Sequence, residues 1–200
     1  MNIVLVHGIF RSGRNMHKLA QALRAQGHQC WTPTLRPSDG RCGLEALAQQ
    51  LKSYIHAHVP PNTPLVLIGF SMGSIVSRVY LQLLGGAARV QAFIAISGPQ
   101  QGTQLAWLGW GQGARDMRPG SSLLQKLHAT AHRLQTLTLL NYWTPYDLVI
   151  VPAANSRWQQ AQHQYAMPVW LHALMPSHPA VIANVVQQVQ QLGADNAHAQ

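Results

Sequence analysis

The order of apolar and polar residues along the chain predicts an alternation of strands and helices. Short apolar runs, typical of strands buried on both faces, occupy residues 3–6, 65–68 and 90–96, the last with Gln91 as its one polar residue. Apolar residues recur at helical spacing over residues 16–26 and 44–58 and again after Met72. Such an alternation is typical of a mainly parallel sheet covered by helices on both faces.

The same pattern continues to the end of the chain. Further strands are predicted near residues 29–32, 135–140 and 164–171. The last of these contains Pro168, which suits an edge position in the sheet. A final helix is predicted over residues 179–192, ended by Gly193 and followed by a frayed tail. The predicted fold class is therefore α/β, with three α/β/α layers and a mostly parallel sheet of about six strands.

One segment departs from this rhythm. Residues 98–120 are rich in glycine and proline, contain Trp107 and Trp110, and show no clear period. The chain of 200 residues has no internal repeat and no linker, so we predict a single domain over residues 1–200. Within it, residues 98–120 are predicted to form an irregular pocket wall or a small lid. The two tryptophans either face a substrate or simply pack under a loop.

A serine lies at an abrupt junction between a predicted strand and a predicted helix. Only the sequence GFSMG, residues 69–73, separates the apolar run 65–68 from the helical pattern that follows. The glycines let such a turn close without Cβ clashes, and the turn lifts the hydroxyl of Ser71 away from the sheet. Ser71 is therefore a candidate nucleophile, the alternative being a tight turn that happens to contain a serine.

A serine nucleophile needs a base and an orienting carboxylate, and the chain has only five acidic residues. Asp147 follows the predicted strand 135–140, at the carboxyl end where ligands bind in parallel sheets. We predict it as the acid because it also comes after the serine in the chain. Asp116 is the reserve, and a structural turn or cap is the other interpretation of Asp147.

Two of the eleven histidines follow the acid in a loop after a predicted strand. His178 stands just before the last predicted helix, between Pro176 and Pro179, and we predict it as the base because it has the reach to turn back toward the serine. His172 lies closer to the strand end and is interpreted as a packed or hydrogen-bonded structural residue.

The intermediate of acyl transfer carries an oxyanion that needs fixed N–H donors. One donor is expected from the backbone of Met72, directly after the serine, and the other from the loop after the first strand. Because Gly8 allows that loop to bend, the predicted donor is Ile9, with Phe10 as the fallback. His7 is expected to brace the loop by hydrogen bonds.

Together these motifs resemble the α/β-hydrolase superfamily, most closely its small bacterial lipases and esterases. The similar stretches are VLVHGIF (4–10), IGFSMGSIVSRVYL (68–81), TPYDLVIVP (144–152) and, more weakly, SGPQQGT (97–103). The resemblance implies a trimmed version of that fold with a Ser71–Asp147–His178 triad, an acyl-serine intermediate, and no cofactor or metal. It implies a serine hydrolase that cleaves carboxylic esters of small molecules or lipids.

The chain also departs from the pattern of that superfamily. Phe70 stands where a histidine is common, Ser74 replaces a frequent glycine, and Gln100 occupies a place often held by histidine. A substrate pocket is predicted from Phe10, Phe70, Trp107 and Trp110. An acyltransferase or thioesterase on the same triad, and a non-catalytic lipid- or partner-binding protein on this scaffold, are the alternative functions.

The charge balance of the chain is strongly basic. Fourteen lysines and arginines face five acidic residues, for a net charge of +9. They are scattered without interleaved aromatics, so no nucleic-acid partner is expected, while weak contact with an anionic membrane surface stays open. Without a signal peptide or membrane-spanning run, a cytoplasmic location is expected. Cys30 and Cys42 are expected to be free thiols.

Overall fold

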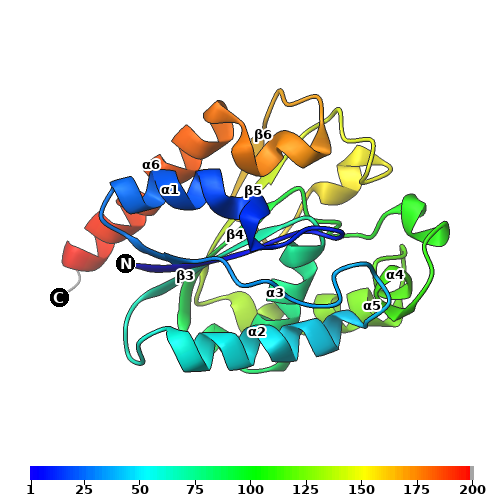
Figure 1. The fold of residues 1–200 in the computed structure, drawn as a ribbon, viewed down its shortest axis with the longest axis horizontal. Coiled ribbons are helices and arrows are strands. Elements are labelled where there is room, and N and C mark those ends of the chain that lie inside the picture. Colours follow the sequence, from blue (N-terminus) through cyan, green and yellow to red (C-terminus); the bar gives the residue numbers. More distant parts are fainter. Residues whose placement is uncertain (199–200) are drawn as a thin grey trace.

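A parallel six-stranded sheet forms the middle layer of the molecule in the computed structural model, which describes residues 1–198 (Figure 1). The strands are β1 (Asn2–Val6), β2 (Gln29–Trp31), β3 (Leu65–Phe70), β4 (Val90–Ile96), β5 (Thr138–Trp143) and β6 (His163–Ala166). Their order in the sheet is β2-β1-β3-β4-β5-β6, and every neighbouring pair is parallel. The predicted fold class is confirmed.

Helices cover both faces of the sheet (Figure 1). Helices α1 (His17–Ala25) and α6 (Pro179–His198) lie on one face, and α2 (Leu44–His58) and α3 (Met72–Leu83) lie on the other. Two further helices, α4 (Gln112–Asp116) and α5 (Ser122–Ala129), follow β4 in the chain. Short 3-10 turns are η1 (Gly13–Met16), η2 (Gly86–Ala88), η3 (Gln104–Trp107), η4 (Ala131–Leu134), η5 (Ala153–Ser156) and η6 (His172–Ser177). Each face of the sheet has its own hydrophobic core.

Two strands, β5 and β6, differ most in extent from their prediction. β5 starts three residues after the predicted position, because the N–H of Leu137 is bonded to the carbonyl of Leu134 in a turn. β6 ends at Ala166, before Pro168, which has no N–H for a strand ladder. The residues after Ala166 therefore form a loop where the apolar pattern had predicted strand.

Gly193 does not end the last helix, contrary to its prediction. A glycine ends a helix when it adopts a left-handed conformation. Gly27, after α1, does so with a φ of 81°, whereas Gly193 is not among the glycines with positive φ and α6 continues to His198. Of the predicted frayed tail, residues 199 and 200 lie outside the described part of the chain.

The parallel arrangement places the carboxyl ends of all six strands at one edge of the sheet. The loops after β1, β3, β4, β5 and β6 therefore gather at the same end of the molecule (Figure 1). The segment 98–120, which contains η3 and α4, belongs to this group. Within residues 1–198, no helix has the length and apolar character needed to cross a membrane.

Candidate active site

The turn between β3 and α3 holds Ser71 in a strained conformation. Its φ of 53° and ψ of −124° lie outside the regions that non-glycine residues favour. A Cβ atom on Gly69 would lie 2.7 Å from the carbonyl oxygen of Gly73, and one on Gly73 would lie 2.5 Å from those of Val6 and His7. Glycines at both positions are therefore required for the strand to turn directly into the helix with the serine at its corner.

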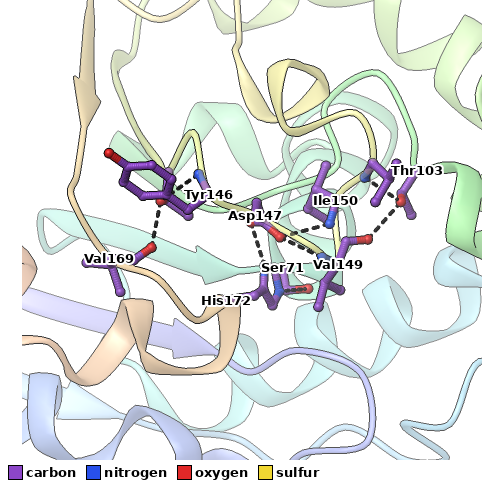
Figure 2. A network of polar contacts seen from close by, with 10 residues as sticks. Ser71, Thr103, Tyr146, Asp147, Val149, Ile150, Val169 and His172 are labelled. Carbon is purple, nitrogen blue, oxygen red and sulfur yellow. Dashed lines mark hydrogen bonds and ion pairs between the residues drawn. The ribbon is translucent and has the colours of Figure 1, made fainter.

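His172 makes the contact with Ser71 that was predicted for His178. Its Nε2 lies 2.9 Å from the Oγ of Ser71, and its Nδ1 lies 2.7 Å from Oδ2 of Asp147 (Figure 2). His178 instead accepts a 3.3 Å hydrogen bond from the N–H of Ala180 at the start of α6. The prediction for His178 is wrong because β6 ends early, which leaves a loop that carries His172 back over the sheet edge.

Asp147 is buried, and both of its carboxylate oxygens have hydrogen-bond partners. Its Oδ1 accepts hydrogen bonds of 2.9 Å from the N–H groups of Val149 and Ile150, while Oδ2 faces His172 (Figure 2). These backbone donors fix the carboxylate, which in turn fixes the orientation of the imidazole.

Asp116, the reserve acid, has a structural position instead. Its Oδ2 accepts a 2.8 Å hydrogen bond from the N–H of Leu44, the first residue of α2, and its Oδ1 accepts one of 2.7 Å from Nε2 of Gln112. Because a carboxylate at a helix N-terminus satisfies a free N–H and the helix dipole, Asp116 is a cap of α2.

Two threonines that sequence reasoning missed hold the acid loop in place. Thr144 donates a 2.7 Å hydrogen bond to the carbonyl of Val169, in the loop that carries His172. Thr103 donates to the carbonyl of Val149 at 2.8 Å and accepts from the N–H of Val151 at 2.9 Å. Their signal in the sequence was their place in the stretches TPYDLVIVP and SGPQQGT.

Phe70 packs against the imidazole rather than lining the cleft. Its ring centroid lies 5.0 Å from that of His172, and the side chain is buried. A Cβ on Gly8 would approach the same ring to 3.1 Å. The apolar residue before the serine thus fills the space between the loop after β1 and His172.

The loop after β1 is braced by His7, as predicted. Its Nδ1–H donates to the carbonyl of Gly8 at 2.8 Å, and its Nε2 accepts from the N–H of Leu35 at 2.9 Å. Only the neutral ring can make both bonds. Burial lowers the pKa of His7, which also favours the neutral form. The ring is therefore held neutral and in one tautomer.

The hydrogen bonds of this loop limit which of its backbone N–H groups can act as an oxyanion donor. The N–H of Phe10 is bonded to the carbonyl of Ser38 at 2.7 Å, so the fallback oxyanion donor is already occupied. Met72 is the first residue of α3, where an N–H has no acceptor within the helix. Ile9 and Met72 remain the predicted donors.

Ser71 opens into an apolar cleft of about 380 Å³. Two of the predicted pocket residues, Phe10 and Trp110, line it together with Ile9, Leu108 and others. Trp107 does not line the cleft. Its ring is exposed and lies 4.5 Å from the guanidinium of Arg118.

Gln100 serves a buried cation next to this region. Its Oε1 accepts a 3.0 Å hydrogen bond from Arg78, whose guanidinium also donates to Gln82 and lies 5.3 Å from the ring of Trp158. Burial lowers the pKa of Arg78 to about 9. The glutamine that replaces a common histidine is thus a partner of Arg78.

The parallel sheet and the helices on its two faces define a protein of the α/β-hydrolase fold class. The chain belongs to the alpha/beta hydrolase fold family, whose model matches residues 2–121. No curated protein sequence matches the chain significantly.

Solved structures share the fold over nearly the whole chain at low sequence identity. The mature lipase BlEst2 of Bacillus licheniformis is 15% identical, with a TM-score of 0.72 over 94% of this chain and 91% of its own. A pyrethroid hydrolase of Sphingobium faniae is 16% identical, with a TM-score of 0.65 over 98% and 99%. Polyneuridine aldehyde esterase is 16% identical, with a TM-score of 0.66 over 94% and 98%.

Proposed function

We propose that the protein is a serine hydrolase that cleaves carboxylic esters through an acyl-serine intermediate, as an esterase or lipase does. The observation that carries this proposal is the hydrogen-bonded chain from Ser71 through His172 to Asp147 beside an apolar cleft. The structural neighbours, named as a lipase, an esterase and a pyrethroid hydrolase, support the same class of reaction.

Each member of the chain has a defined part in the reaction. Ser71 Oγ attacks the carbonyl carbon while Nε2 of His172 accepts its proton. Asp147 holds the Nδ1–H tautomer and stabilises the imidazolium. The imidazolium then protonates the leaving alkoxide, which departs as the alcohol. A water molecule, deprotonated by the same imidazole, attacks the acyl-serine, and the imidazolium returns that proton to Ser71 Oγ as the acid is released.

The tetrahedral intermediates need donors that are fixed before the reaction begins. We assign this role to the N–H groups of Ile9 and Met72, on the loop after β1 and at the start of α3. His7 fixes the conformation of the loop after β1 through its two hydrogen bonds. The bond from Phe10 to Ser38 turns the next N–H away from this task.

The cleft favours an apolar group on the acyl or alcohol side of the ester. Its wall combines aliphatic and aromatic side chains from residues 103–117 with Ile9 and Phe10, and its volume of about 380 Å³ is in the range of small-molecule sites. A small-molecule or lipid ester is therefore the substrate class that we propose.

Two measurements on the purified protein test the proposal. A fluorophosphonate probe is expected to label Ser71, identified by peptide mass spectrometry, and nitrophenyl esters of increasing acyl length are expected to be hydrolysed. Ser71→Ala should abolish both signals. Formation of free acid rather than a new ester in the presence of added alcohol distinguishes hydrolysis from acyl transfer. Absence of labelling and of turnover in a folded protein would overturn the proposal.

A further inference from the structure

Exposed apolar side chains are concentrated at one end of the molecule. Among the side chains that the structure describes, eleven large hydrophobic ones are exposed, and all of them follow the carboxyl ends of strands. Phe10 follows β1, and Leu105, Trp107, Leu108 and Trp110 follow β4. Tyr146, Leu148 and Val149 follow β5, while Trp170, Leu171 and Leu174 follow β6. Because the sheet is parallel, these four loops share one edge (Figure 1).

This apolar rim surrounds the cleft that contains Ser71. Phe10, Leu108 and Trp110 line the cleft, yet they are 71%, 85% and 73% exposed. Leu148 is 78% exposed and lies next to Asp147 in the chain. A rim of this kind on a folded chain marks an interaction surface, since monomeric proteins rarely expose so many large apolar groups together.

Several rim side chains are held in their exposed positions. The ring of Trp170 stacks on that of Tyr146 at 4.3 Å. Arg118 lies 4.5 Å from the ring of Trp107 and donates hydrogen bonds to the carbonyls of Ala106 and Gly109. The outward position of these aromatic rings is therefore built into the loops.

Arginines flank the rim. Arg11 and Arg14 line an open hollow of about 540 Å³ together with Phe10. Arg115 is exposed and is the fourth residue of α4, the helix that follows Trp110 in the chain. Guanidinium groups beside an aromatic side chain suit phosphate oxygens above an apolar layer.

Acidic side chains do not oppose these arginines in the described structure. Asp39 lines the cleft but is paired with Arg41 at 2.7 Å, and Asp116 and Asp147 are buried. Glu45 lies 3.4 Å from Lys126. With a net charge of +9 for the whole chain, the rim offers apolar groups and unopposed positive charge together.

We propose that this rim docks onto an anionic lipid surface, with the aromatic and leucine side chains in the headgroup and acyl region and Arg11 and Arg14 on the phosphates. Tryptophan and tyrosine favour the membrane interface, and basic side chains next to inserted apolar ones strengthen binding to anionic lipid. The cleft would then open toward the lipid. Docking is a binding property, separate from ester hydrolysis, so it is measured in Ser71→Ala.

A second copy of the chain is the other occupant that the experiment distinguishes. Lipid is favoured because the apolar side chains come from four separate loops around the cleft, while the arginines place positive charge at the margin of the rim. A second copy would bring like charges together, with Arg11 and Arg14 of each copy adding to the repulsion.

The experiment uses vesicles of phosphatidylcholine with and without phosphatidylglycerol, and the full chain carrying Ser71→Ala. Co-flotation is expected with the anionic vesicles and is expected to weaken with salt. Replacing both Trp107 and Leu148 by serine should reduce the partition coefficient by more than about tenfold, since neither side chain lines the cleft. Arg11→Gln with Arg14→Gln should reduce it by about twentyfold.

A matched variant controls for net charge. Arg24→Gln with Lys52→Gln removes the same two charges from exposed positions on α1 and α2, and should lower vesicle binding by less than about threefold. Each variant is checked by circular dichroism and thermal melting. The proposal would be overturned if the Arg11 and Arg14 variant and the Arg24 and Lys52 variant lost vesicle binding equally. Unchanged binding in the Trp107 and Leu148 variant would overturn it as well. A failure to bind anionic vesicles would also overturn it. If sedimentation in that case showed a dimer that dissociates when Trp107 and Leu148 are replaced by serine, the rim would be an interface between two copies of the chain.

Discussion

His172 Nε2 lies 2.9 Å from Ser71 Oγ, although 101 residues separate the two in the chain. The contact depends on the loop after β6, which turns back over the carboxyl edge of the sheet, and on Asp147, which holds the other ring nitrogen. A histidine only six positions further along the chain, His178, lies at the start of α6 instead. The two histidines therefore give a direct test of the site.

We expect His172→Ala to lower kcat by about 10⁴-fold or more with nitrophenyl esters, because the serine loses its general base. His178→Ala should change kcat by less than about twofold. Both variants should melt as cooperatively as the parent protein. The assignment would be wrong if His178→Ala lost activity and His172→Ala kept it.

The two buried aspartates are predicted to separate catalysis from stability. Asp147→Asn should lower kcat by about 10⁴-fold because the imidazole loses the partner that fixes its tautomer. Asp116→Asn keeps an acceptor for the N–H of Leu44 but loses the charge at the start of α2, which should lower the free energy of unfolding by about 1 kcal/mol. Steady-state kinetics and urea unfolding measure the two effects. Equal losses of activity in both variants would contradict this division.

Local sequence pattern was enough to predict most of the fold. The predicted helix 44–58 and strand 90–96 have the bounds that α2 and β4 show, because their apolar periodicity and flanking residues act over a few positions. The end of β6 was not predictable in this way. An apolar run does not show where a segment leaves the sheet, and here that difference decided which histidine reaches Ser71.

The site shows the same division between local and distant causes. Ser71 was predictable because a strand, two glycines and a helix within a few residues demand a strained turn. The position of Phe70 depends on contacts with Gly8 and His172, which come from opposite ends of the chain. Its neighbours could be found only in the folded structure.

Phe70 is predicted to position His172 without binding substrate. Phe70→Leu keeps most of the buried volume, so the free energy of unfolding should fall by about 1–2 kcal/mol. Because the imidazole loses the ring that packs against it, kcat should fall by about tenfold, while KM should change by less than about twofold since Phe70 does not line the cleft.

Phe70→Tyr provides the matched control for that change. It retains the aromatic ring against His172, so kcat should stay closer to that of the parent protein than in Phe70→Leu. A rise in KM with unchanged kcat in Phe70→Leu would instead place the side chain in the substrate site.

His7 is predicted to make the protein less stable in mild acid. Its pKa is lowered by burial in the folded state, so the unfolded chain binds the proton more readily below its ordinary pKa of about 6.5. The stabilisation due to the neutral ring is therefore complete above that value and is lost as the pH falls toward the folded pKa. Protonation would also place an N–H on Nε2 opposite the N–H of Leu35.

Thermal melting between pH 7.5 and 5 measures this effect in the parent protein and in His7→Gln, which cannot titrate. The melting temperature of the parent should fall with decreasing pH, and the fall should be smaller in His7→Gln. His28→Gln and His128→Gln are the controls, because burial lowers the pKa of those histidines as well but they lie outside the loop after β1. If the acid-induced loss were unchanged in His7→Gln and removed in a control, the bracing of that loop by a neutral His7 would not be what limits stability in acid.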